Sequence, residues 1–575
     1  MDYNAEYDKW LSSPVVDEST KSAMRDPALD KKELFSVSLE FGTAGLRGIM
    51  RPGTNSMNVY TVRHATQGIS NLVLSQNARD KGIVIAYDSR NHSKEFAEAA
   101  AEVIAANGIK AYIFDDIRPT PELSFALIHL GCKAGINITA SHNPKEYNGY
   151  KAYWEDGAQL PPDHAETVSQ TIASVDIFGG VKTIPYAEGI KSGLIEVIGS
   201  GIDEKYLAEV AKQSVNPDAV RNAGADFKVV YTPLHGAGRK LVPEILKRQG
   251  LSNLLTVPEQ MIPDGNFPTV KFPNPEFREV FNPGIEIAKR ENCSLLIGTD
   301  PDADRTGIVV RDSGGEYIPF SGNQVGALLL DYIITAKKER GELPANAFAV
   351  KTIVSTELAS KICADNGVEL FDVLTGFKFI GEKIKEYHET GKLTFLFGFE
   401  ESYGYLAGTY ARDKDAVVAS MLLVEMAAFY KSRNMTLYDA MESIYKRYGY
   451  YGEAGENIGF KGLSGVARMK EIMSELRRTA AKTVREIAGY KVTQFRDYQT
   501  SEITDTVTGK VSGTGLPKSD VLYFSLDNGS KVIIRPSGTE PKIKIYYLLK
   551  DASKESAAEQ TERLKAAMLS VVARE

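Results

Sequence analysis

IVIAYDSRNHSKEFAEAAAEVIAANGIKAYIF, residues 83–114, contains two apolar runs separated by a helical pattern. The first run, 83–87, predicts a buried strand, and the spacing of apolar residues predicts a helix from about Ser93 to Ala106. Gly108 ends this helix, and a second strand is predicted at 111–114. Strand, helix and strand in this order predict a mostly parallel sheet with helices on both of its faces.

The same alternation continues along the chain. A helix from about Pro121 leads to a strand at 134–139, and similar units occupy 227–298 and 348–398. From about Tyr490, several strands precede a C-terminal helix, which predicts a smaller α+β domain. We therefore predict an α/β protein with three similar α/β domains of mixed, mostly parallel sheets at 1–200, 201–318 and 319–480, and an α+β domain at 481–575.

The composition is that of an ordinary globular protein, with 43% hydrophobic and 25% charged residues. A length of 575 residues is too great for one core and predicts roughly three to five domains. The net charge of -7 and the absence of a Lys/Arg-rich run give no footprint for nucleic acid. An acidic protein with an anionic substrate must gather its cations locally.

The cysteines and apolar stretches bear on the compartment. Cys132, Cys293 and Cys363 have neither metal-site nor disulfide spacing, which favours a reducing environment. The N-terminal residues are polar and unlike a secretory signal. The most apolar later stretch, 416–429, contains Glu425 and is shorter than the ~20 residues that a membrane span needs. We expect a cytoplasmic protein without membrane partners.

The loops that follow predicted strands are the candidate sites, because ligands of open α/β sheets bind at the carboxyl ends of the strands. After the strand ending at Thr139 comes Ala140-Ser141-His142-Asn143-Pro144. A serine in this position, with a histidine beside it, is a candidate nucleophile. The same residue types also form ordinary polar turns, so this loop alone leaves both interpretations open.

A second loop carries three carboxylates. Asp300, Asp302 and Asp304 occupy every second position after the predicted strand 295–298, and in an extended segment they would project to one side. Three like charges so close repel each other unless a cation lies among them, and hard oxygen ligands suit Mg²⁺. An EF-hand does not fit, because its sixth position would be Arg305 instead of Gly. The alternative is a solvated acidic turn.

Further polar loops fit a sugar phosphate. Glu400-Glu401-Ser402 can hydrogen-bond to sugar hydroxyls, and Lys414 can donate or accept a proton. The segment 535–541, Arg-Pro-Ser-Gly-Thr-Glu-Pro, offers a guanidinium, hydroxyls and backbone N–H groups to a phosphate. The segment 41–48 is glycine-rich and contains Arg47, but it is neither a dinucleotide fingerprint nor a P-loop.

Together and in this order, the motifs resemble those of the α-D-phosphohexomutase superfamily over essentially the whole chain. The matching motifs are Gly-Leu-Arg-Gly at 45–48, Thr-Ala-Ser-His-Asn-Pro at 139–144, Asp-Pro-Asp-Ala-Asp-Arg at 300–305, Glu-Glu-Ser at 400–402 and Arg-Pro-Ser-Gly-Thr-Glu-Pro at 535–541. The second and the last are the most specific. The resemblance implies four domains around a central cleft, of which the first three share an α/β core.

The resemblance also implies roles for individual residues. Ser141 would be the phosphoserine, and its phosphate would bind one Mg²⁺ together with Asp300, Asp302 and Asp304. Lys414 would be a general acid/base, with His142 a further candidate for proton handling. The remaining implied residues are Arg47, Lys151 and Arg305 near the reacting phosphate, Glu400 and Ser402 at the sugar hydroxyls, and Arg535, Ser537, Gly538 and Thr539 at the non-reacting phosphate.

The activity implied by the resemblance is the interconversion of glucose 1-phosphate and glucose 6-phosphate, with glucose 1,6-bisphosphate as intermediate and activator. Pro301 and Ala303 stand where the family often has glycines and should stiffen the metal loop. Phe399 replaces a common glycine, and Phe-Glu-Glu-Ser-Tyr-Gly-Tyr is similar to the longer branch that includes glucose and pentose mutases. Mannose or pentose phosphates therefore stay open as substrates, as does the activity of a sugar-bisphosphate synthase, and both monomer and dimer stay open.

Two rivals from other classes explain fewer motifs. A phosphotransferase with an aspartyl phosphate at Asp302 would match Asp-x-Asp-x-Thr at 302–306, but it leaves Ser141 and the 535–541 loop without roles. A non-catalytic relative that only binds sugar phosphate is disfavoured, because every implied catalytic position holds a chemically competent residue. An acid-stable phosphoserine would distinguish the mutase from the first rival.

Overall fold

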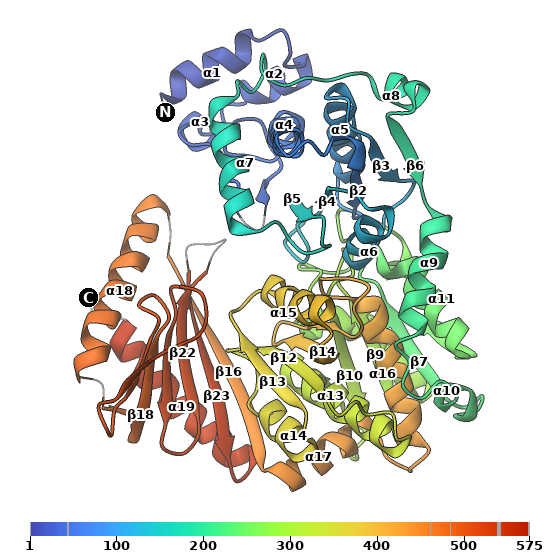
Figure 1. Cartoon of the computed structure of the whole chain (residues 1–575), viewed down its shortest axis with the longest axis vertical. Helices are drawn as coiled ribbons and strands as arrows, with labels where there is room; N and C mark the ends of the chain where they lie inside the picture. The colour runs from blue at the N-terminus through green and yellow to red at the C-terminus, as the bar shows by residue number, and fades with distance from the viewer. Residues whose placement is uncertain (1, 43–44, 461, 484, 538–541, 573–575) are drawn as a thin grey trace. The chain divides into compact units, whose positions relative to one another are not determined.

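The chain is built on β-sheets flanked by helices (Figure 1). The computed structural model describes residues 2–42, 45–460, 462–483, 485–537 and 542–572. In chain order, these residues form sheets of six, five, four and eight strands. The chain divides into two compact units: the first comprises Met1–Ser321, Gly381–Phe397 and Ser402–Leu437, and the second comprises Gly322–Ile380, Gly398–Glu401 and Tyr438–Glu575.

Three short helices precede the first sheet: α1 (Tyr3–Ser12), α2 (Glu18–Met24) and α3 (Lys31–Phe35). They pack around Trp10, which is fully buried. Its ring makes edge contacts with Phe35 and Tyr60 at centroid distances of 5.7 and 5.3 Å. This aromatic cluster joins the N-terminal helices to the helix that contains Tyr60.

The first sheet has a parallel centre and two antiparallel strands at one side. The strand order is β1-β5-β4-β2-β3-β6, and β1 and β5 are the antiparallel members. Every residue of β2 and β4 is buried, as expected for strands covered on both faces. The elements are β1 (Leu46–Ile49), α4 (Val59–Ser75), β2 (Ile83–Tyr87), α5 (Ser93–Ala106), β3 (Ala111–Phe114), α6 (Thr120–Leu130), β4 (Ala134–Ile138), β5 (Tyr147–Trp154), α7 (Pro162–Ser174), α8 (Tyr186–Ser192) and β6 (Ile195–Ile198).

The second sheet repeats this plan in the order β11-β10-β9-β7-β8, with β7, β8 and β9 parallel and β10 and β11 antiparallel. The turn that joins β9 to β10 contains the three aspartates. The elements are α9 (Ser200–Ala211), α10 (Ala219–Asn222), β7 (Lys228–Thr232), α11 (Gly238–Gln249), β8 (Asn253–Thr256), α12 (Asn282–Glu291), β9 (Leu295–Thr299), β10 (Thr306–Arg311) and β11 (Tyr317–Phe320).

The third sheet has the order β13-β12-β14-β15, and the C-terminal sheet has the order β16-β23-β22-β21-β18-β19-β20, with β17 paired to β18. Every pairing described in the C-terminal sheet is antiparallel. The elements are α13 (Gly322–Glu339), β12 (Ala347–Thr352), α14 (Leu358–Asn366), β13 (Glu369–Val373), α15 (Phe377–Thr390), β14 (Thr394–Glu400), β15 (Gly404–Leu406), α16 (Ala416–Lys431), α17 (Leu437–Tyr448), β16 (Tyr450–Gly459), α18 (Gly462–Thr483), β17 (Glu486–Ile487), β18 (Tyr490–Asp497), β19 (Glu502–Asp505), β20 (Val511–Gly513), β21 (Leu522–Leu526), β22 (Lys531–Pro536), β23 (Lys542–Asp551) and α19 (Lys554–Val572).

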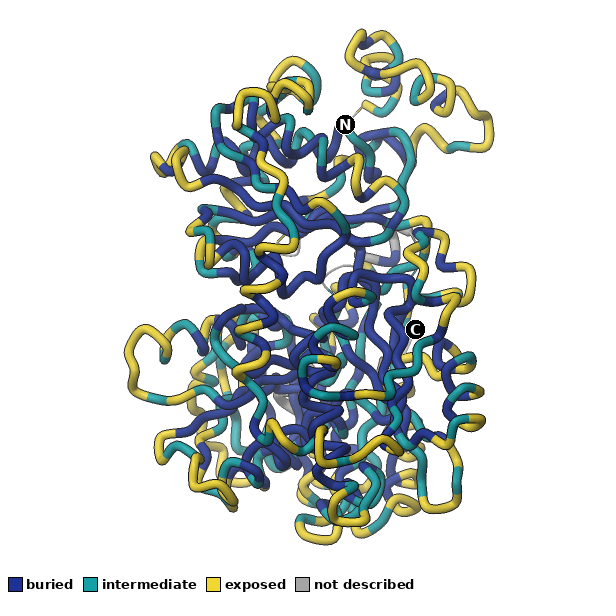
Figure 2. Tube along the Cα trace, turned by 90° about the vertical axis from the view of Figure 1, so that its right-hand side faces the viewer, coloured by how far each residue is buried: buried dark blue, intermediate teal, exposed yellow. Residues whose placement is uncertain are grey.

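Buried residues concentrate along the sheet strands and exposed residues at the turns (Figure 2). Helix α16, the most apolar stretch noted in the sequence, is buried along nearly its whole length and packs against α11 within the first unit. Among the described residues, no helix combines the length and the apolar character needed to cross a bilayer.

The predicted fold class is confirmed: three mixed α/β sheets precede an antiparallel C-terminal sheet. The predicted strands 83–87 and 111–114 and the helix 93–106 coincide with β2, β3 and α5. Strand β5 (Tyr147–Trp154) was not among the strands predicted from the sequence. Glycine and polar residues in β5 hide its strand character, which depends on its neighbours β1 and β4. The boundaries of the four domains stay predictions.

Candidate active site

Ser141 lies shortly after β4, beyond Thr139 and Ala140, in a left-handed backbone conformation with φ of 52°. Its side chain is buried, and Oγ lies 2.8 Å from Oδ2 of Asp300. The Nδ1 atom of His142 lies 3.2 Å from the same Oγ. The candidate nucleophile therefore faces the first aspartate of the acidic loop, although 159 positions separate them in the sequence.

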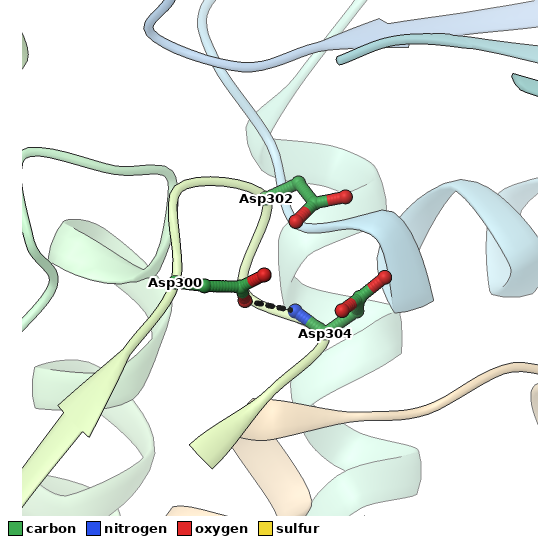
Figure 3. A group of neighbouring side chains, drawn as sticks. All are labelled: Asp300, Asp302 and Asp304. Carbon is green, nitrogen blue, oxygen red and sulfur yellow. Dashed lines mark hydrogen bonds between the residues drawn. The ribbon is translucent and has the colours of Figure 1, made fainter. Parts of the chain in front are cut away.

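The three aspartates converge because their segment turns (Figure 3). The alternation of the aspartates predicts an extended segment; instead, residues 301–303 form a turn between β9 and β10, with Ala303 at φ of 50°. Oδ1 of Asp300 accepts hydrogen bonds from the backbone N–H groups of Asp304 and Arg305, at 3.1 and 2.9 Å. One oxygen from each aspartate lies within 4.8 Å of the others.

These oxygens fit a divalent cation. All three aspartates are buried, and Oδ1 of Asp302 and Oδ1 of Asp304 accept no hydrogen bond from any described residue. A buried carboxylate oxygen without a partner is costly, and a cation held between such oxygens removes that cost. A donor set made only of oxygen suits a hard cation. Asp300, Asp302 and Asp304 thus form a candidate metal site.

Close carboxylates raise the pKa values of the aspartates, and nearby cations lower them. Burial and the charges of Asp302 and Asp304 hold the pKa of Asp300 well above its usual range. Burial alone would raise the pKa of Asp304 as well, but Lys151, Lys414 and Arg305 outweigh burial and hold that pKa below its usual range. The lowered pKa of Asp304 is consistent with the ammonium groups of Lys151 and Lys414, which lie 3.1 and 3.3 Å from its Oδ2.

Two lysines bind the outer oxygens of the acidic loop. Lys151 Nζ lies 2.7 Å from Oδ2 of Asp302 and 3.1 Å from Oδ2 of Asp304. Lys414 Nζ lies 3.3 Å from Oδ2 of Asp304 and 3.1 Å from Oδ1 of Asp413. Both lysines are buried, so each ammonium group is compensated by carboxylates rather than by water.

Two arginines of the predicted site lie in the same unit. Arg47 Nη1 donates to Oδ1 of Asn143 at 3.0 Å, which places it against the Ser141 loop. Arg305 Nη1 lies 3.5 Å from Oε1 of Glu276. Burial and the charges of Arg305 and Arg47 hold the pKa of His142 well below its usual range. Ser141, His142 and these two cations are thus brought together.

The remaining predicted residues are divided between the units. Glu400 belongs to the second unit, where its Oε1 accepts the backbone N–H of Gly376 at 2.9 Å, whereas Ser402 belongs to the first. In the second unit, Arg535 Nε donates to the hydroxyl of Tyr546 at 3.3 Å. The N–H of Ser537, the next predicted residue, donates to a backbone carbonyl at 2.8 Å. Gly538 and Thr539 lie outside the described residues.

Two residues that were not predicted join these contacts: Thr120 binds the acidic loop, and Tyr153 binds Asp413, the carboxylate partner of Lys414. Thr120 donates from Oγ1 to Oδ2 of Asp302 at 3.0 Å, and its N–H donates to the Asp302 carbonyl at 2.8 Å. Tyr153 donates its hydroxyl to Oδ2 of Asp413 at 2.9 Å. Tyr153 could have been found from the sequence, because it stands two positions after Lys151 and so lies on the same face of β5. Nothing near Thr120 in the sequence indicates its contact with Asp302.

Three family models match the chain in succession. They are the α/β/α domains I, II and III of phosphoglucomutase/phosphomannomutase, and they match residues 38–177, 204–315 and 321–448. The first two contain the Ser141 loop and the acidic loop. The third contains Glu400, Ser402 and Lys414.

Individual proteins resemble the chain in sequence or in fold. A phosphoglucomutase of Staphylococcus saprophyticus is 38% identical over 528 residues, which cover 92% of this chain and 93% of the relative. The solved structure of parafusin, a Paramecium phosphoglucomutase, has a TM-score of 0.68 at 19% identity and covers 93% of this chain and 95% of its own. An Aspergillus fumigatus N-acetylphosphoglucosamine mutase, solved with GlcNAc-6P and magnesium, has a TM-score of 0.51 at 12% identity and covers 93% of this chain and 96% of its own. The identity and coverage of the Staphylococcus relative, together with the three matched domains, show that this chain belongs to the phosphoglucomutase/phosphomannomutase family.

Proposed function

We propose that this chain interconverts glucose 1-phosphate and glucose 6-phosphate, with Ser141 as the phosphoryl carrier. The observation that carries the proposal is the distance of 2.8 Å between Ser141 Oγ and Oδ2 of Asp300, the first of three buried aspartates. A serine placed against a candidate metal site is suited to hold a phosphoryl group. The choice of glucose is supported by curated relatives named phosphoglucomutase at 36 to 39% identity.

The reaction has two phosphoryl transfers. In the first, the bond between phosphorus and Oγ of phosphorylated Ser141 breaks, a bond forms to O6 of glucose 1-phosphate, and the hydroxyl proton passes to a base. The product, glucose 1,6-bisphosphate, then turns end over end. In the second transfer, Oγ takes the phosphoryl group from O1, and O1 receives a proton. The carrier is regenerated, and glucose 6-phosphate is released.

Asp300, Asp302 and Asp304, with the phosphate of Ser141, would hold Mg²⁺. When bound, this ion neutralises negative charge on the phosphoryl group during transfer. Magnesium in the solved Aspergillus relative supports this choice of metal. Oδ1 of Asp302 and Oδ1 of Asp304 are buried and accept no hydrogen bond from described residues, so they would be available to the ion. The Oδ2 atoms of the same aspartates contact Lys151 and Lys414.

The other residues have roles in proton transfer and binding. Lys414, between Asp304 and Asp413, donates and accepts the sugar hydroxyl proton, with His142 the second candidate. Arg47, Lys151 and Arg305 offset the charge of the reacting phosphate, which an acidic protein must do locally. Residues assigned to the sugar are Glu400 and Ser402, and those assigned to the phosphate that is not transferred are Arg535, Ser537, Gly538 and Thr539.

The test is turnover of glucose 1-phosphate with Mg²⁺ and a trace of glucose 1,6-bisphosphate, measured as glucose 6-phosphate. Mannose 1-phosphate and ribose 1-phosphate are assayed in parallel. Ser141→Ala removes the carrier, and Ser70→Ala is its control, because Ser70 is a buried serine on α4 whose Oγ has no hydrogen-bond partner among the described residues. The phosphorylated residue is identified by mass spectrometry after acid treatment.

We expect glucose turnover in the wild type and in Ser70→Ala, none in Ser141→Ala, and an acid-stable phosphate on Ser141. Faster turnover of mannose or ribose phosphate would overturn the choice of glucose and leave the phosphoserine standing. Release of free bisphosphate without formation of the isomer would indicate a synthase. An acid-labile phosphate on Asp302, or turnover by Ser141→Ala, would contradict the carrier itself.

A further inference from the structure

Both backbone polar groups of Ser141 are bound by side chains. Its N–H donates to Oγ1 of Thr139 at 2.8 Å, and its carbonyl accepts from Nη2 of Arg90 at 2.5 Å. Thr139 in turn donates to Oδ2 of Asp88 at 2.7 Å. Asp88 and Arg90 follow directly after β2, the strand next to β4 in the sheet. The N–H of Ser141 is therefore held through Thr139 and its carbonyl directly, in both cases by a residue at the end of the neighbouring strand β2.

Arg90 binds more of this loop than Ser141 alone. The Nη2 atom also donates to the carbonyl of Asn143 at 2.5 Å, and Nη1 donates to the carbonyls of Pro144 and Tyr147 at 2.8 and 3.0 Å. One guanidinium thus joins four carbonyls from both ends of the turn between β4 and β5. Only a planar group with several fixed N–H donors can satisfy such a set.

Arg90 is itself held rigidly. Its side chain is fully buried, and Nε lies 3.3 Å from Oδ2 of Asp88. Oδ1 of Asp88 accepts the backbone N–H of Arg90 at 2.9 Å. The ring of Phe267, a buried residue, lies 5.1 Å from the guanidinium carbon. Burial, the Asp88 carboxylate and the Phe267 ring therefore restrict the guanidinium that binds the loop.

Ser141 needs this support because of its backbone. A non-glycine residue at φ of 52° is strained and persists only where its surroundings impose it. We propose that Arg90, with Asp88 and Thr139, is a positioning unit that holds Ser141 in the left-handed conformation and aims Oγ at the acidic loop. Arg90 touches no reacting atom in this role. The proposal rests on the proposed function, in which Oγ must meet two ends of one sugar bisphosphate.

The first test is Arg90→Lys, which keeps the positive charge but cannot donate to four carbonyls. We expect kcat for glucose 1-phosphate to fall about 100-fold, because small errors in the placement of a reacting group have effects of this size. The KM should change by less than about threefold, because the substrate-binding residues are untouched. Amide hydrogen exchange should accelerate in the segment 139–147.

Arg118→Lys is the matched control. Arg118 is equally buried, and its guanidinium donates to Asp203 and Asp115 instead of to the Ser141 loop. This variant should lose stability without a selective loss of kcat in the folded fraction. A fall in kcat no greater for Arg90→Lys than for Arg118→Lys, or normal exchange in 139–147, would overturn the positioning role.

Thr139→Val tests the other side of the peptide with a nearly isosteric change. It removes the acceptor of the Ser141 N–H and, like Arg90→Lys, should lower kcat with little change in KM. If Arg90→Lys does not fold, a wild-type kcat in folded Thr139→Val contradicts the proposal by itself. Absence of turnover in the wild type would refute the proposed function instead, and faster exchange of 139–147 in the variants would still support the positioning unit.

Discussion

Ser141 and Ala303 are non-glycine residues at positive φ, 52° and 50°, in the two loops that meet at the candidate active site. Pro301 and Ala303 were expected to stiffen the acidic loop, and the structure gives a reason why the stiffness matters. A turn, and not an extended strand, brings three like charges together, and repulsion opposes that turn. Pro301 has few alternative conformations and loses less entropy when it is fixed there, whereas Ala303 at φ of 50° is strained and is held by its surroundings.

At the residue scale, Lys151 offers a test of the charge balance. Lys151→Met leaves Asp302 and Asp304 without their shared ammonium group, and we expect the free energy of unfolding in EDTA to fall by about 3–5 kcal/mol. Mg²⁺ should restore more stability to the variant than it adds to the wild type, because the ion replaces part of the lost positive charge. Urea unfolding with EDTA and with Mg²⁺ measures both effects.

Lys133→Met is the control for this change. Lys133 pairs at 2.7 Å with Glu155, whose side chain is 52% exposed. Such partly solvated pairs contribute about 0–1 kcal/mol. If Lys133→Met and Lys151→Met lower the free energy of unfolding equally, Lys151 does not compensate the charges of Asp302 and Asp304 in the way the distances indicate.

At the scale of the element, strand β5 organises the basic side of the candidate active site. Lys151 and Tyr153 are two positions apart, so both lie on one face of the strand. Lys151 reaches Asp302 and Asp304, and Tyr153 reaches Asp413, the neighbour of Lys414. A single strand register therefore sets the positions of two cations relative to the acidic loop.

Tyr153→Phe is predicted to lower kcat by about 3- to 10-fold, the size expected for the loss of one positioning hydrogen bond of about 1 kcal/mol. The KM should hardly change, because Lys414 keeps its contacts with Asp304 and Asp413. Steady-state kinetics across pH measures the effect on proton transfer. Tyr150→Phe is the comparison: its hydroxyl lies 3.2 Å from Oγ1 of Thr66, away from the acidic loop. If Tyr153→Phe and Tyr150→Phe change kcat equally, the contact of Tyr153 with Asp413 has no specific role.

The loop after β7 supports the metal loop through a close backbone approach. A Cβ at Gly236 would lie 2.4 Å from Cα of Pro301, and the N–H of Ala237 donates to the Pro301 carbonyl at 2.7 Å. Gly236→Ala should therefore displace residues 300–304, lower stability by about 1–3 kcal/mol and weaken Mg²⁺ binding. Isothermal titration with Mg²⁺ and urea unfolding measure these effects.

Gly201→Ala provides the comparison for this substitution. Gly201 lies in α9, and nothing would contact its added Cβ within 4 Å. Alanine in a helix should be stabilising by about 0.5–1 kcal/mol, with Mg²⁺ affinity unchanged. Unchanged Mg²⁺ affinity in Gly236→Ala would mean that the acidic loop does not depend on this contact.

At the scale of the whole molecule, the two units have separate cores. The first sheet packs around a cluster that includes Ile85 and Ile136. In the second unit, another cluster joins Ile353 and Leu374 to Ile533 of the C-terminal sheet. Since these clusters share no residue, each unit has its own source of hydrophobic stabilisation.

Calorimetry should therefore resolve unfolding transitions that respond to different substitutions. Ile533→Ala should lower the transition of the second unit by the equivalent of about 2–5 kcal/mol and leave that of the first nearly unchanged. Ile136→Ala should do the reverse, because both side chains are fully buried in their own clusters. A common shift of all transitions by either variant would show that the units unfold as one.

The order of residues along the chain was sufficient for the α/β class, for β2, α5 and β3, and for the motif around Ser141, because these depend on local periodicity and on residue types close in sequence. The contacts of Thr120 with Asp302 and of Arg90 with the Ser141 loop arise only in the folded chain. Thr120 and Asp302 are 182 positions apart and Arg90 and Ser141 are 51 apart, and no local pattern encodes such distances. Sheet pairing and the turns at the strand ends placed them together, because packing of the whole chain selects which polar groups meet in its interior.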